Sequence, residues 1–195
     1  MSMIQDGKGT GAFAGVTPNN RLLTTGIDLS LTEAATETGD TYNINTATVP
    51  LTTTGEHALL YLKNHEDTNL IIDTTIVNIK DFVGTAGQPI LKIYRNPTGG
   101  TIISDAVECE ISNRNYGSSK VLDVFCYQGG ESKTLTGPSI DIFLPTVAAG
   151  TFNSFSTLVV LPKGASIGLA WIPPAGMTSV DIVAAFNVTL NGTQL

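Results

Sequence analysis

The glycine-rich stretch GKGTGAFAG at residues 7–15 has the G-x-G-x-x-A spacing of a dinucleotide-binding turn. Such a turn binds a pyrophosphate when a strand precedes it and a helix follows, with its N-terminal amides facing the phosphates. The residues before Gly7 are few and polar, and Pro18 stands where the helix should run. Lys8 also lacks the Gly-Lys-Ser/Thr context of a phosphate-binding loop. The sequence therefore predicts an extended glycine-rich arm here rather than a nucleotide site.

Histidines and their neighbouring carboxylates are the next candidates for acid–base or metal chemistry. His57 begins the strand-like run HALLYLKN and is expected at its exposed end. His65, Glu66 and Asp67 are consecutive in a turn, and consecutive residues rarely converge on one ion, because zinc sites use spaced Cys and His ligands. We therefore expect a solvated turn rather than a metal site.

Glu108 and Glu110 form the one carboxylate pair with a spacing suited to catalysis. Residues two apart on a strand lie about 7 Å from each other, which resembles the separation of a glycosidase pair. That reaction needs a cleft, sugar-stacking aromatic residues and unequal environments for the two acids, and the chain has a single Trp. We interpret the pair as a solvated strand face. The sequence thus predicts no catalytic residue, no metal site and no cofactor, and a protein that is not an enzyme.

The two cysteines lie in strand-like segments. Cys109 alternates with Val107 and Ile111 and is expected to point inward with them, and Cys126 lies in the apolar run VLDVFCYQ. Two cysteines do not make a disulfide framework, so we expect buried free thiols in a protein made in a reducing cytoplasm.

Composition narrows the fold class and the partners. Charged residues are 14% of the 195 residues, against about 25% in an average soluble domain, and 20 Gly and 9 Pro favour turns between strands. A net charge of −7, with basic residues scattered singly, argues against a nucleic-acid partner. No apolar run approaches the ~20 residues of a membrane-spanning helix, and the N-terminus lacks the features of a secretory signal, so no membrane partner is expected.

Short strand-like runs bounded by turn residues follow one another from about residue 46. They lie at 46–52, 57–64, 69–82, 89–96, 100–112, 120–128, 139–145, 155–162, 166–173 and 179–190. Many short strands without long helices predict an antiparallel β-sandwich, and the length suits a jelly roll. We expect a bulge near Asp73, where the apolar pattern changes face, and a central strand at 179–190.

Residues 1–45 are predicted to form an extended N-terminal arm, separate from a sandwich domain at 46–195. A capping box from Ser30 to Glu33 and a terminating Gly39 indicate one short helix near 31–38. Two helical turns are too few to be stable alone, so this helix needs a surface to lie on.

Several blocks of the sequence resemble one group of proteins. They are DGKGTGAFAGVTPNNRL (6–22), EAATETGDTYNINTATVPLT (33–52), ALLYLKNHEDTNLII (58–72), RNPTGGTIIS (95–104), ISNRNYGS (111–118) and LPKGASIGLAWIPPAG (161–176). Together they resemble small virion proteins of tailed bacteriophages, the head accessory proteins known as capsid decoration or cement proteins. The resemblance implies a β-sandwich or jelly roll without catalytic residues. It also implies binding to the major capsid protein and to other copies, as a homotrimer on the capsid surface.

The arm would then become ordered on a partner surface. Phe13, Leu22 and Leu23 are its expected apolar anchors, and Arg21 is expected to pair with a carboxylate of the neighbour, which the guanidinium fork suits.

Two alternatives stay open. The chain is alternatively a tail, baseplate or head-fibre component, present in far fewer copies. A carbohydrate-binding module for host adsorption is the other, and it requires exposed aromatic side chains. Tyr116, Trp171 and Tyr127 are the candidates for such glycan contacts.

Overall fold

The chain forms two compact units, Met1–Leu31 and Thr32–Leu195. The structure, a computed structural model, describes residues 3–5, 13–16, 22–23, 31–85, 87–104, 107–144 and 148–191. In the first unit a small antiparallel sheet contains the strands β1 (Met3–Gln5), β2 (Phe13–Val16) and β3 (Leu22–Leu23).

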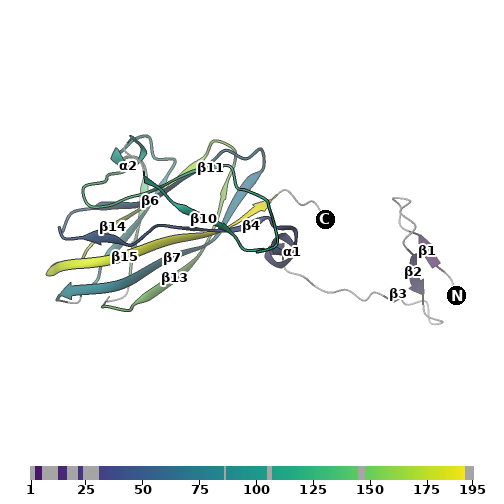
Figure 1. Cartoon of the computed structure of the whole chain (residues 1–195), viewed down its shortest axis with the longest axis horizontal. Coiled ribbons are helices and arrows are strands. Elements are labelled where there is room, and N and C mark those ends of the chain that lie inside the picture. The colour runs from purple at the N-terminus through teal and green to yellow at the C-terminus, as the bar shows by residue number, and fades with distance from the viewer. Residues whose placement is uncertain are drawn as a thin grey trace. The chain divides into compact units, whose positions relative to one another are not determined.

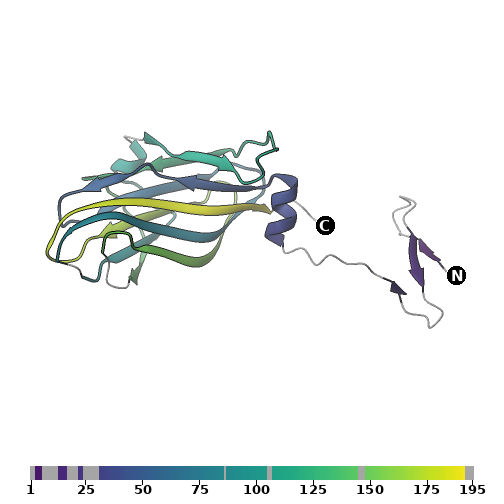
Figure 2. The same cartoon turned by 60° about the horizontal axis from the view of Figure 1, so that its bottom comes forward.

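The second unit is an all-β sandwich of two antiparallel sheets, each with six strands among the described residues (Figures 1 and 2). The first sheet has the order β10-β4-β15-β7-β13, with β5 also paired to β15. Its strands are β4 (Thr41–Asn45), β5 (Val49–Leu51), β7 (Asn69–Gly84), β10 (Glu110–Asn113), β13 (Phe152–Leu161) and β15 (Met177–Asn191). The second sheet has the order β12-β8-β14-β6-β11-β9. Its strands are β6 (His57–Asn64), β8 (Ile90–Arg95), β9 (Val107–Glu108), β11 (Val124–Gln128), β12 (Ser139–Phe143) and β14 (Ser166–Ile172).

The main core fills the space between the two sheets. Strand β15 contributes every second residue to it, because successive side chains of a strand point to opposite faces. The buried positions on this face are Val180, Ile182, Ala184, Phe186 and Val188. Strand β15 lies in the interior of its sheet, between β4 and β7, so the central strand expected at 179–190 is confirmed.

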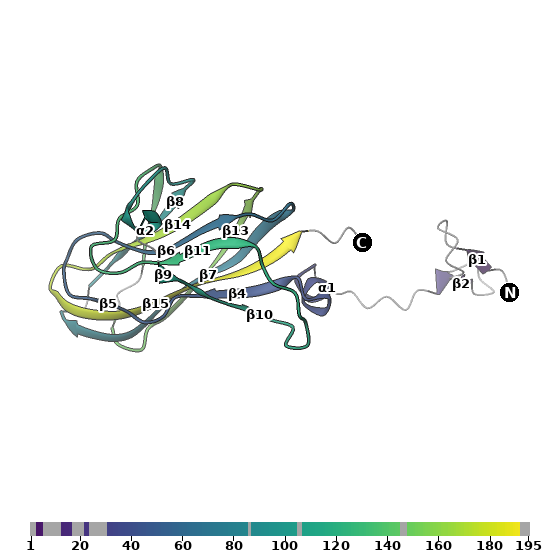
Figure 3. The same ribbon diagram turned by 45° about the horizontal axis from the view of Figure 1, so that its top comes forward.

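A second, smaller core lies on the outer face of the second sheet. The helix α2 (Thr101–Ser104) and the segment around Leu135 cover β6 and β14 there (Figure 3). Ile102 is fully buried in this cluster with Ala58 and Ala170. Strand β6 is therefore buried on both faces, which explains why its sequence is a nearly continuous apolar run.

Two local features of the sequence reappear in the fold. The register between β7 and β15 shifts where Thr74 pairs with Asn187 and Ile72 with Val188, so Asp73 is the extra residue of a bulge, as expected. The helix α1 (Leu31–Thr38) coincides with the helix expected near 31–38, and Gly39 follows it with a φ of 78°, in the left-handed region that glycine adopts without strain.

The border between arm and sandwich differs from the sequence expectation. Strand β4, which was assigned to the arm, pairs with β15 on one side and with β10 on the other. Tyr42 and Ile44 of this strand are almost fully buried, and Ala35 of α1 is buried as well. The sandwich unit therefore begins at Thr32 rather than at residue 46. Thr and Asn residues between the apolar positions of TYNIN made this strand resemble the arm in composition.

His57 is also placed differently from the expectation. It lies directly opposite Trp171 on β14 and is buried rather than exposed. Its Nε2 atom contacts the carbonyl oxygen of Thr53 at 3.0 Å. The segment before the strand folds back over this end of β6, so the imidazole is a packed side chain rather than a solvent-facing base.

Candidate interaction surfaces

The surface with the clearest potential for association is the edge formed by β13 and β12, which we call the open edge. Strand β13 pairs with β7, and no described strand pairs with its other side. Its ten residues, FNSFSTLVVL, include no charged side chain. Edge strands of soluble monomers are usually protected by lysines, prolines or a covering segment, because unpaired amides and carbonyls invite another strand. An unprotected strand of this length is a candidate contact with another chain.

Large apolar side chains are exposed along the same edge. Their exposed fractions are 62% for Phe152, 73% for Leu158, 50% for Val160 and 69% for Ile140 of β12. Leu158 is unusual in a second way, since its φ of 35° lies in the left-handed region that costs a non-glycine residue about 1–2 kcal/mol. It belongs to a bulge between Ser156 and Val159. Strained backbone at an exposed apolar residue indicates a position that serves something other than the stability of the isolated fold.

An apolar cavity of about 150 Å³ lies between the two sheets at the open edge. Ile93, Ile140, Val159, Leu161 and Ile167 contribute most of its apolar lining. A recess of about this size can accept an apolar group about as large as benzene. The open edge therefore combines protruding side chains with a recess that matches one of them in size.

Tyr94 of β8 is also among the residues that line this cavity, and its hydroxyl makes a polar contact. Its hydroxyl donates a hydrogen bond to Glu56, which forms an ion pair with Lys92 at 2.7 Å. Burial, followed by the hydrogen bond and the charge of Glu56, raises the pKa of Tyr94 to about 12. The Glu56 carboxylate also raises the pKa of Lys92 above its usual value. These contacts tie β8 to Glu56, just before β6.

The opposite side of the sandwich, which we call the crossing edge, is built differently. A single segment, residues 107–113, pairs first with β11 of the second sheet and then with β4 of the first (Figure 3). Cys109 lies at the point where the segment changes sheets, and its amide donates to the carbonyl oxygen of Cys126 at 3.1 Å. The expected burial holds for Cys126, whereas Cys109 is only partly buried.

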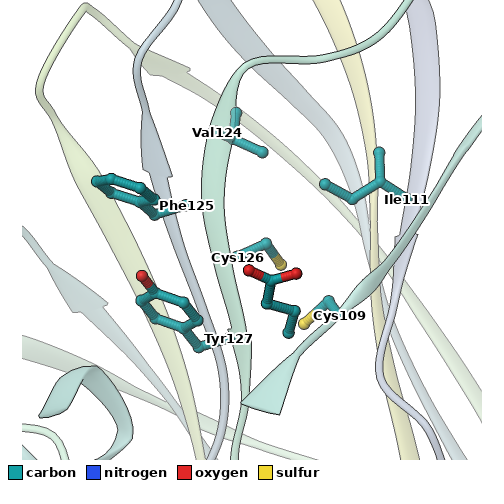
Figure 4. Close-up of a pocket in the computed structure, with 7 residues that line it drawn as sticks. Cys109, Ile111, Val124, Phe125, Cys126 and Tyr127 are labelled. Atoms are coloured by element: carbon teal, nitrogen blue, oxygen red, sulfur yellow. The ribbon is translucent and has the colours of Figure 1, made fainter. Parts of the chain in front are cut away.

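A second cavity, of about 100 Å³, opens beside the two thiols (Figure 4). Glu108, Cys109 and Cys126 line it, together with Ile111 and Val124. Burial raises the pKa of the Cys126 thiol, and the hydrogen bond with Cys109 adds to that shift. Both cysteines are free.

A row of aromatic rings lies along β6 and β11 of the second sheet, with Tyr61 at its buried end. Tyr61 and Tyr127 lie parallel with 6.0 Å between ring centroids, and Phe125 lies 6.2 Å from Tyr127. His65 meets the Phe125 ring at 4.0 Å in an edge-on arrangement. Tyr61 and Phe125 were missed by the sequence reasoning, because their proximity to Tyr127 depends on the pairing of β6 with β11.

The remaining residues singled out from the sequence do not converge on one site. Trp171 is fully buried in the main core and offers no surface to a glycan, whereas Tyr116 is 97% exposed. Phe13, Leu22 and Leu23 belong to β2 and β3 of the first unit. Their side chains and Arg21 lie outside the description of the structure.

The acidic residues singled out from the sequence do not share a common ligand site. They either contact different residues of the chain or face water. Asp67 forms an ion pair with Lys163, which lowers the pKa of the Asp67 carboxyl, and Glu66 accepts a hydrogen bond from the amide of Asp123 at 2.7 Å. Glu108 and Glu110 are both exposed. Within the described part of the chain, no three His, Cys, Asp or Glu side chains are placed to hold a metal ion.

Comparisons with known proteins found no family model that matches the chain and no curated protein that matches it significantly. In the ranges that the structure describes, no helix has the length and apolar character needed to cross a membrane. The open edge and the sequence blocks are therefore the observations on which a function can be argued.

Proposed function

We propose that this chain is a structural protein of a tailed-bacteriophage virion, without catalytic activity. In this proposal it is a capsid decoration, or cement, protein that binds the lattice of the major capsid protein and stabilises the head. The proposal rests on strand β13, which is uncharged, exposes apolar side chains and has no described partner strand on its outer side, together with the resemblance of the sequence blocks.

The charge distribution explains why the open edge suits association with other copies of the chain. Each copy carries a net charge of −7, so most approaches between copies bring like charges together. Contact along β13 places no charged side chain of that strand in the interface and needs no desolvation of its ions. Burying Phe152, Leu158 and Val160 also removes apolar surface from water, at about 25 cal/mol per Å².

The open edge offers a protruding side chain and a recess for contact between copies. Leu158 protrudes from β13, and the recess beside Ile140 and Val159 lies on the same edge of the sandwich. Insertion of the protruding side chain of one copy into the recess of the next is a heterologous contact, and such contacts close into rings when the rotation permits. A ring of three copies is the homotrimer that the resemblance implies.

We also propose that the sandwich is a jelly roll. Eight strands of the two sheets support this proposal: β4, β6, β7, β8, β12, β13, β14 and β15. When these strands are numbered one to eight in chain order, their order is 1-8-3-6 in one sheet and 2-7-4-5 in the other. This strand order supports a jelly roll, in which β9 to β11 would be an insertion between the fourth and fifth strands. Jelly rolls are common in viral capsid and lectin domains. The fold alone does not determine the role, which depends on the surfaces of the protein.

The first unit supports a role in attachment. Its sheet consists of strands of two to four residues, and sheets this small rarely have independent stability. Contact with a partner would add buried surface to this small sheet. We propose that this arm binds a neighbouring subunit or the capsid, with Phe13, Leu22 and Leu23 as apolar anchors and Arg21 as the charged one.

The proposal is tested by locating and counting the chain in purified particles. A decoration protein is expected in hundreds of copies, distributed over the head, when its band is quantified against the major capsid protein and its density is located in a particle reconstruction. A handful of copies at one vertex or on the tail would instead identify a tail, baseplate or head-fibre component. Absence from particles would overturn both.

A carbohydrate-binding role remains the alternative of a different class. The exposure of Tyr116 and the aromatic row that includes Phe125 are the features that favour it, although buried Trp171 cannot take part. Glycan-array binding by the wild-type chain that is lost in Tyr116→Ala or Phe125→Ala, with the fold intact, would support this role. A wild-type chain that binds no glycan would exclude it for the glycans on the array.

A further inference from the structure

The register of the crossing edge places the two cysteines opposite each other. Glu108 pairs with Tyr127, so the next pair along the two strands is Cys109 with Cys126. The hydrogen bond from the Cys109 amide to the Cys126 carbonyl confirms this pairing. Directly opposite residues of an antiparallel pair have Cα atoms about 4.5–5.5 Å apart, within the roughly 4.4–6.8 Å that a disulfide spans. The backbone therefore needs no rearrangement to accept a bond between them.

The side chains satisfy the same requirement. Both cysteines line the same cavity, and Figure 4 shows both sulfur atoms in the space between the two strands. These are the only two cysteines of the chain, so no other intramolecular pairing competes. A single oxidation would convert this contact into a covalent cross-strand bond.

Access for an oxidant is provided from one side. Cys109 is partly exposed and lines the cavity of about 100 Å³, whereas Cys126 is only 4% exposed. A small reagent therefore reaches Cys109 first. Cys126 stays protonated in its buried position and is available for a second step within the protein.

We propose that Cys109 and Cys126 form a reversible disulfide when the folded protein meets a low-molecular-weight disulfide such as oxidised glutathione. The Cys109 thiolate attacks one sulfur of the reagent, forms a mixed disulfide and releases one glutathione thiolate. Cys126 loses its proton and attacks the Cys109 sulfur, which releases the second glutathione. The two protein thiols are oxidised to one disulfide, the reagent is reduced to two glutathione molecules, and the two protons end on those thiols.

The bond would tie the crossing segment to the second sheet. It closes the loop between Cys109 and Cys126, which contains β10 and the exposed Tyr116. Closing a loop of this length restricts the unfolded chain, so the oxidised protein unfolds at a higher temperature. The inference does not require the virion role. Under that role, the bond would form after particles leave the reducing cytoplasm.

The test uses the purified full-length chain, reduced and then equilibrated in buffers with increasing ratios of oxidised to reduced glutathione. After acid quench and alkylation of remaining thiols, mass spectrometry is expected to show a doubly alkylated species replaced by an unalkylated one, whose mass is about two hydrogens below that of the reduced, unalkylated chain. Peptide mapping should link Cys109 to Cys126. The oxidised form should melt about 5–10 °C above the reduced form, and added dithiothreitol should remove the difference.

Two variants separate the steps. Cys126→Ser should stop at a single glutathione adduct on Cys109, and Cys109→Ser should leave Cys126 unmodified while the protein is folded. The wild-type measurement does not depend on either variant folding. Two thiols that remain alkylatable in excess oxidised glutathione would overturn the proposal. So would a stable adduct on wild-type Cys109, or a disulfide between two chains.

Discussion

The two long edges of the sandwich differ in how the ends of the two sheets are connected. At the crossing edge, residues 107–113 pair with β11 of one sheet and then with β4 of the other, so one segment links the two sheets. At the open edge, β12 and β13 end their respective sheets, and no described segment pairs with their outer sides. Apolar side chains such as Val107 are exposed at the crossing edge too, but Glu108 and Glu110 stand beside them. Strand β13 has no such charges.

The cavities at the two edges differ in size and in the side chains that line them. The recess at the open edge is lined chiefly by aliphatic side chains, which suits an apolar group from another chain. The cavity at the crossing edge is smaller and contains the two thiols and the Glu108 carboxylate. Residues 107–113 therefore link the two sheets at the crossing edge, whereas no described segment does so at the open edge, where we propose contacts between chains.

The largest expected effect comes from removing part of the crossing edge. A chain that lacks residues 1–45 loses β4, including the buried Tyr42 and Ile44, whereas a chain that lacks residues 1–30 keeps it. Losing two large core residues costs about 3–5 kcal/mol each, which is comparable with the whole stability of a domain. We expect the shorter chain to be unfolded by circular dichroism and thermal melting. The chain without residues 1–30 should retain the cooperative transition of the full sandwich. Equal melting of the two truncated chains would show that β4 is not part of the core.

The second-largest expected effect is on association between copies of the chain. Leu158→Lys places a charge in the middle of the open edge and is expected to weaken self-association at least ~30-fold, the loss of about 2 kcal/mol typical of an interface hot spot. Val107→Lys at the crossing edge is the matched control, since Val107 is also exposed and on a strand. Sedimentation velocity over a concentration series measures both. If both variants associate like the wild type, the open edge is not the contact between copies. Equal weakening of both would mean that net charge, rather than position, controls association.

The effect of alkaline pH tests the environment of Tyr94, which packs in the smaller core on the outer face of the second sheet. Its pKa is raised to about 12 in the folded state, so the unfolded chain loses this proton at lower pH than the folded one. Stability is therefore expected to fall between about pH 10 and pH 12, by on the order of 1–3 kcal/mol. Tyr94→Phe should remove that part of the pH dependence, as measured by urea denaturation at each pH. An unchanged slope in the variant would assign the alkaline loss to other groups.

The smallest expected effect comes from Leu158, where one substitution separates backbone strain from association between copies. Asn tolerates the left-handed conformation better than Leu, so Leu158→Asn should stabilise the isolated fold by about 0.5–1 kcal/mol while association weakens. Urea denaturation at low protein concentration gives the first quantity and sedimentation the second. A destabilised fold with unchanged association would mean that Leu158 contributes to the sandwich rather than to a partner surface.

The sequence alone predicted the features that depend on neighbouring residues along the chain. Alternation with period two identified the buried face of β15, and a break in the same pattern located the bulge at Asp73. The helix before Gly39 followed from local capping and termination signals. These predictions succeed because strand pleating and helix capping are determined within a few residues.

Tertiary structure decided which strands meet, and therefore which surfaces exist. Alternation shows that residues share a face, but it does not identify the strand that lies alongside. The composition of residues 32–45 suggested an arm, and only pairing with β15 and β10 made Thr41–Asn45 a core strand. Trp171 became a core residue, and Cys109 met Cys126, through pairing between strands distant in sequence. The exposure of Leu158 likewise follows from the position of β13 at the end of its sheet, a property of the whole topology rather than of the residues around it.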